Sequence, residues 1–109
     1  MTTVSFHLEG DRIVSFESSG HSGYAEAGSD IVCAAVSSIV SMVEIAINDV
    51  MGLEASVKVD SKNAKISLKL PGNLPKKADE TCQTLLLSMM LQLMHLHEEY
   101  PENIIVLEV

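Results

Sequence analysis

The sequence predicts an α+β domain in the order ββαββαβ, with a mostly antiparallel five-stranded sheet and two helices packed on one face. Three observations predict it. Apolar and polar residues alternate in several short segments, the period changes to about 3.6 residues in two long segments, and Gly or Pro separates many of them. We expect residues 1–109 to form a single domain, because a chain of this length suits one hydrophobic core.

The first two strands form a predicted hairpin. Residues 2–9 and 12–19 alternate between apolar and polar side chains, as half-buried strands do, and Gly10-Asp11 turns the chain between them. The side chains expected to face the core are Val4, Phe6, Leu8, Val14 and Phe16.

A second hairpin and a last strand follow the same reasoning. Residues 56–60 and 64–70 alternate on either side of Ser61-Lys62-Asn63, which predicts two paired strands. Residues 104–109 are apolar on both alternating faces, so we expect them to form a central strand of the sheet.

Two helices are predicted over residues 30–51 and from about 76 to 98. The first ends at Gly52, and the second begins directly after Pro75. The first has one narrow polar stripe, made of Ser37, Ser41, Glu44 and Asn48. Apolar side chains cover more of each helix than the one side that packs against the sheet. We therefore expect a homodimer in which the helices contribute to the interface.

Composition narrows the function classes. The net charge is −8, without a block of Lys or Arg, which argues against nucleic acid or an anionic membrane as main partner and suits a basic protein or peptide. We interpret residues 85–94 as the longest apolar block, which is too short to span a membrane, and the first ten residues do not resemble a signal peptide. The sequence therefore predicts a soluble, cytoplasmic protein.

Its two cysteines form neither a disulfide framework nor a zinc-type spacing, which indicates a reducing compartment. Cys82 is interpreted as a packing residue within a helix. His95 and His97 point to different faces of the same helix, so they do not suit a two-histidine metal clip. We expect no metal and no cofactor.

The residues that suit a catalytic role lie between 20 and 37. If Ser29 or Asp30 caps the helix, Cys33 falls in its first turn, where unpaired N–H groups and the helix dipole favour a thiolate and could hold an oxyanion. A strand end and the adjoining helix start can bring His21 within reach of that sulfur as a base.

Each of these residues also has a simpler interpretation. A lone cysteine on an apolar helix is usually a small core residue, and a histidine between glycines is often a turn residue. Asp30 is first of all a helix cap, and Tyr24 fits an exposed loop aromatic.

The combination is more specific. Gly-His-x-Gly-Tyr-Ala at residues 20–25 and Gly-x-Asp-Ile-Val-Cys-Ala-Ala-Val-Ser at residues 28–37 resemble the bacterial ribosomal-processing cysteine proteases called Prp. The one departure within these motifs is Ser22, where that family commonly has Ala.

The resemblance implies a homodimeric endopeptidase that removes a short N-terminal extension, next to paired phenylalanines, from the twenty-seventh protein of the large ribosomal subunit. On this basis Cys33 is the nucleophile and His21 the general base and acid, while Asp30 and Ser37 support the site. Loop 20–29 would close over the substrate, with the residues Gly20, Ser22, Gly23, Tyr24 and Gly28.

Two other functions remain open at this stage. One is a non-enzymatic acidic homodimer that binds a ribosomal protein during assembly, with Cys33 merely buried. The other is a thiol redox sensor. It is the least favoured of the three functions, because no resolving cysteine lies near Cys33 in the sequence.

Overall fold

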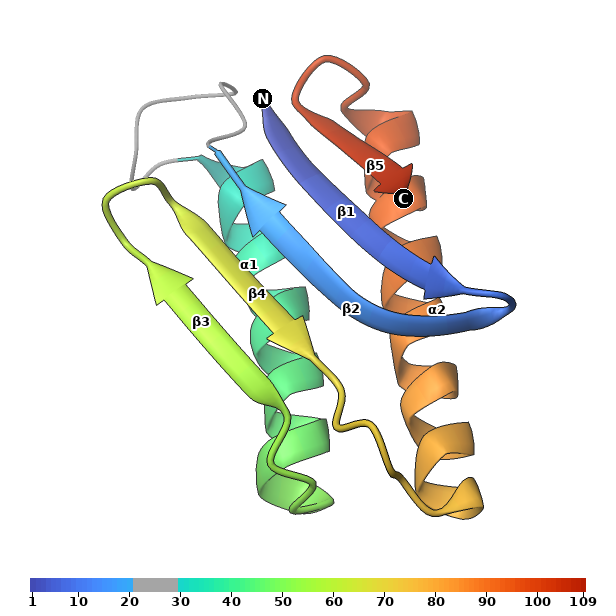
Figure 1. Ribbon diagram of the computed structural model, residues 1–109. Helices are drawn as coiled ribbons and strands as arrows, with labels where there is room; N and C mark the ends of the chain where they lie inside the picture. Colours follow the sequence, from blue (N-terminus) through green and yellow to red (C-terminus); the bar gives the residue numbers. More distant parts are fainter. Residues whose placement is uncertain (21–29) are drawn as a thin grey trace.

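The computed structural model describes residues 1–20 and 30–109, and its elements follow the predicted order. They are β1 (Thr2–Glu9), β2 (Arg12–Ser19), α1 (Ile31–Glu44), the π-helical turn η1 (Ile45–Val50), β3 (Ser56–Asp60), β4 (Lys65–Lys69), α2 (Lys76–Glu99) and β5 (Ile104–Glu108). The five strands form one sheet in the order β3-β4-β2-β1-β5, and both helices cover the same face of it (Figure 1). Neighbouring strands are antiparallel except β1 and β5, so the α+β prediction is confirmed.

A bulge in the first hairpin changes which side chains reach the core. The register shifts between His7 and Leu8, so that Leu8 lies opposite Ile13 and His7 lies opposite Ser15. Val14 is the extra residue, and it is buried outside the main core cluster, while Ile13 takes the core position. Val14 is buried as predicted, and the inserted residue adds Ile13 to the core, which alternation alone does not predict.

The last strand is at an edge of the sheet, so the expectation of a central strand is wrong. Among the strands of the described residues, β5 pairs only with β1, and α2 forms the crossover that a parallel pair of strands requires. Ile104 is fully buried, whereas Leu107 is 40% exposed. Apolar residues on both faces of a strand therefore do not show that the strand has a neighbour on each side.

Helix α1 begins where the sequence predicts and ends differently. Asp30 is its N-cap, but the α-helical pattern stops at Glu44 and continues as the π-helical turn η1. In this turn the Asn48 side chain donates to the carbonyl of Ala55 at 3.1 Å and accepts from its N–H at 2.7 Å. Gly52, at φ 68°, then reverses the chain as predicted.

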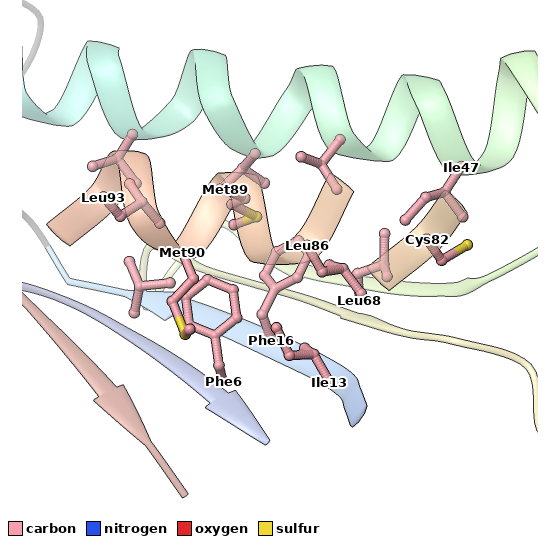
Figure 2. Packing of buried hydrophobic residues seen from close by; sticks show 14 of the residues in the cluster. Phe6, Ile13, Phe16, Ile47, Leu68, Cys82, Leu86, Met89, Met90 and Leu93 are labelled. Atoms are coloured by element: carbon pink, nitrogen blue, oxygen red, sulfur yellow. The ribbon is translucent and has the colours of Figure 1, made fainter. Parts of the chain in front are cut away.

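The core lies between the sheet and the two helices (Figure 2). Phe6 and Phe16 from the central strands meet with ring centroids 6.1 Å apart. Leu86 and Leu93 of α2 are fully buried against this layer. Cys82 is fully buried in the same cluster, so its interpretation as a packing residue is confirmed.

The longest apolar block is not residues 85–94. The continuous helical segment Ile31–Val50 has a mean hydropathy of 2.0, and by length and composition alone it could cross a membrane. Here one side of it packs in the core, through Val32, Val40 and Ile47. The core helix of a soluble protein can have the same length and hydropathy.

Candidate active site

Cys33 is held in the first turn of α1 by the helix cap. Asp30 is extended, with φ −77° and ψ 104°, and its Oδ1 accepts the N–H of Cys33 at 2.9 Å. The backbone carbonyl of Asp30 accepts the N–H of Ala34 at 3.0 Å. Because Asp30 is itself buried, these bonds fix the start of the helix and the position of the half-buried Cys33 side chain.

Cys33 opens into a cavity of about 410 Å³ between α1 and the β3–β4 hairpin. Helix α1 contributes one stripe of side chains to it, spaced at three and four residues, as one face of a helix requires. The stripe consists of Cys33, Ser37, Ser41 and Glu44, and the buried Val36 and Val40 line the cavity beside it. Residues of β3, β4 and the turn between them form the opposite wall, and this turn lies at the same end of the molecule as the start of α1 (Figure 1).

The rim of the cavity includes Gly20, which no other residue could replace without strain. Its φ is +82°, and a Cβ atom there would lie 2.6 Å from the carbonyl oxygen of Met1. The N–H of Gly20 donates to the carbonyl of Ala64 at 3.1 Å. The end of β2 is therefore fixed against both neighbouring strand ends, directly before His21 in the sequence.

Two buried polar residues of the sheet also line the cavity. Thr2 and Ser18 are 2% and 7% exposed. Within the described part of the chain, the Thr2 hydroxyl has no hydrogen-bond partner. The sheet therefore contributes two buried hydroxyl groups to the lining of the cavity.

The structure brings some of the predicted site residues together. Cys33, Ser37 and Gly20 line one cavity, and Asp30 caps the helix that carries Cys33. The predicted residues His21, Ser22, Gly23, Tyr24 and Gly28 lie outside the described residues. The pairing of His21 with Cys33 therefore stays a prediction.

Sequence reasoning missed several lining residues. Ser41 and Glu44 could have been found, because the polar stripe of the first helix continues the spacing of Cys33 and Ser37. Thr2, Ser18 and the β3–β4 residues had no such signal, because strand order and register alone bring them to this position.

The two cysteines have different environments. Burial raises the pKa of the Cys82 thiol, and the nearby Asp79 carboxylate raises it further. Cys33 is half-buried and lines an open cavity. Across residues 1–20 and 30–109, no three His, Cys, Asp or Glu side chains gather in a way that could hold a metal ion.

Comparisons with known proteins find relatives that cover most of this chain. Residues 1–105 match the family described as cysteine protease Prp. The chain is 30% identical over 92 residues to the ribosomal processing cysteine protease Prp of Bacillus subtilis (strain 168), a match that covers 84% of this chain and 82% of that protein.

Solved structures have the same fold. The protein SMU.848 of Streptococcus mutans superimposes with a TM-score of 0.85 at 28% identity, covering 100% of this chain and 94% of the other. The essential ribosomal processing protease Prp of S. aureus, solved with a covalently linked product peptide, superimposes with a TM-score of 0.82 at 24% identity, covering 100% of both chains.

Proposed function

The chain belongs to the Prp family of cysteine proteases and is therefore a peptide hydrolase, and from this premise we propose that Cys33 is its nucleophile. The observation that carries the proposal is the position of Cys33, at a capped helix start that opens into the 410 Å³ cavity. The other cysteine, Cys82, is fully buried in the core cluster. Membership of a protease family favours this role over a non-enzymatic binding factor or a redox sensor.

In the proposed reaction, the sulfur of Cys33 attacks the scissile carbonyl carbon and a carbon–sulfur bond forms. His21 takes the thiol proton of Cys33 as the sulfur attacks, and gives it to the amine that leaves when the carbon–nitrogen bond breaks. It then takes a proton from the water that attacks the thioester, and this proton returns to the sulfur as the carbon–sulfur bond breaks. The support for His21 is its position in the sequence, because it follows Gly20 at the rim of the cavity that Cys33 lines.

The helix start also limits which amides could stabilise the oxyanion. The N–H of Cys33 is already donated to Asp30, and the N–H of Ala34 is donated to the Asp30 carbonyl. Among the described residues, the first-turn amides without such a bond are those of Ile31 and Val32. We assign the oxyanion to this end of the helix, with Asp30 and Ser37 as positioning residues.

The proposed substrate is the precursor of the twenty-seventh protein of the large ribosomal subunit, from which the enzyme removes a short N-terminal extension. The support is the Bacillus subtilis relative, a ribosomal processing protease, together with the two sequence motifs. The net charge of −8 suits a basic ribosomal substrate.

A cleavage assay tests this function. The purified protein is incubated with the extended ribosomal protein, and the product masses are measured. We expect one cut at the extension, and loss of that cut in Cys33→Ala and in His21→Ala while circular dichroism shows that both variants stay folded. Undiminished turnover in either variant would contradict its assigned role.

We also propose that the protein acts as a homodimer in the cytoplasm of a bacterium, without nucleic acid or membrane as a direct partner. The helices expose large apolar side chains that a second copy could cover. On α2 these are Leu87, Leu91 and Met94, exposed by 47%, 47% and 44%. Sedimentation at micromolar concentration tests the dimer, and a stable monomer would refute it.

A further inference from the structure

Glu44 is at the far end of the stripe that begins with Cys33. Eleven residues of helix separate the two, which corresponds to about 16 Å along the helix axis. Between them Ser37 and Ser41 keep the same face of α1 polar, and all four residues line the one cavity. The cavity therefore leads from the candidate nucleophile to a carboxylate.

The other charged groups of this cavity have partners elsewhere. Asp60 accepts hydrogen bonds from Asn63 in the β3–β4 turn, including one from its side-chain amide at 2.6 Å. Lys65 pairs with Glu17 at 3.7 Å. Glu44 is half-buried and has no hydrogen-bond or ion-pair partner among the residues that the structure describes.

We propose that Glu44 is a specificity-determining residue that binds a lysine or arginine side chain of the substrate about five residues from the scissile bond. An extended peptide advances about 3.3 Å per residue, so about five residues span the distance from Cys33. The cavity walls between the two ends suit an extended chain, because Val36 and Val40 are apolar while Ser37 and Ser41 offer hydroxyl groups. A half-buried carboxylate without a partner favours a cation over a neutral or acidic side chain.

This inference rests on the proposed function, since it assigns the cavity to the peptide that Cys33 cleaves. The test uses synthetic peptides that span the scissile bond of the extended ribosomal protein. Lys or Glu is placed at the fourth, fifth or sixth position on either side of that bond, and kcat/KM is measured for each peptide.

We expect the wild-type protein to prefer Lys over Glu about three- to tenfold at one of these positions, on one side of the bond. The preference should shrink between 50 mM and 500 mM salt, because salt screens charges at a partly exposed site. In Glu44→Lys the preference should reverse, and in Glu44→Gln it should disappear.

Glu80→Lys is the matched control, because it makes the same change of charge on the exposed face of α2, outside the cavity. It should keep the wild-type ratio. An equal ratio in the wild type and Glu44→Lys, or no charge preference at any position, would overturn the proposal.

A second measurement separates the two proposals. The same peptides, labelled with a fluorophore, are titrated with Cys33→Ala and with Cys33→Ala/Glu44→Lys, and binding is followed by anisotropy. If no peptide is cleaved by the wild type, the proposed function fails, and the binding ratios still decide the role of Glu44. Lys peptides that bind no better than Glu peptides would refute that role.

Discussion

Gly20→Ala should be unusually destabilising, because two separate effects act at this position. The φ of +82° is left-handed, where a residue with a Cβ pays about 1–2 kcal/mol. In addition the new Cβ would lie 2.6 Å from the Met1 carbonyl oxygen, so the end of β1 must move away from β2. We expect the free energy of unfolding to fall by about 2–4 kcal/mol.

Substitutions at two other glycines distinguish the cost of the left-handed φ from the cost of the contact with Met1. Gly10 has φ +63° and Gly72 has no left-handed φ, and a Cβ at either position would meet nothing within 4 Å. Gly10→Ala should therefore cost about 1 kcal/mol, because the lower entropy of the unfolded chain offsets part of the strain. Gly72→Ala should be neutral or slightly stabilising.

Urea denaturation followed by circular dichroism measures all three variants. With a slope of about 1–3 kcal/mol per M, the midpoint should fall by about 1–2 M for Gly20→Ala and by about 0.5 M for Gly10→Ala. Thr2 and Gly20 line the cavity, so a shift of the end of β1 would displace part of the cavity wall. The kcat/KM of Gly20→Ala should therefore fall about ten- to hundredfold, whereas the kcat/KM of Gly10→Ala should stay at the wild-type value. Equal midpoints for the two variants would refute the reasoning about the Met1 contact.

Three further predictions concern the cap, the buried thiol and the dimer. Asp30→Ala should lower the free energy of unfolding by about 1 kcal/mol in urea titrations, while Asp30→Asn keeps most of the cap. Burial raises the pKa of Cys82, so the unfolded chain loses the thiol proton at a lower pH than the folded chain. The free energy of unfolding should therefore fall as pH rises above about 9, by up to about 1.4 kcal/mol per pH unit. In Cys82→Ala the free energy of unfolding should depend less steeply on pH between about pH 8 and 10.5. Leu91→Glu should shift sedimentation towards the monomer, since it places a charge on the exposed apolar side of α2.

Local patterns predicted the elements well. The alternation of residues 2–9 and the start of α1 at Asp30 appear in the structure within a residue or two. Such features depend on neighbours along the chain, which the sequence lists directly. The bulge at Val14 was missed because alternation alone does not show an inserted residue.

Features that depend on strand order could not be predicted in this way. Strand β5 lies at the edge of the sheet because α2 returns the chain to β1. The apolar residues of β5 do not indicate this edge position. For the same reason Thr2 and Ser18 were not foreseen in the cavity, whereas Ser37 was placed near Cys33 by helix spacing alone.

The central claim is that the sulfur of Cys33 carries out the cleavage, and stoichiometric alkylation tests it most directly. The folded protein is treated with iodoacetamide at neutral pH, and the modified cysteine is identified by peptide mass mapping while cleavage is assayed in parallel. We predict that Cys33 reacts well before the fully buried Cys82, and that activity falls in proportion to Cys33 modification. Full cleavage activity with Cys33 completely alkylated would contradict the account.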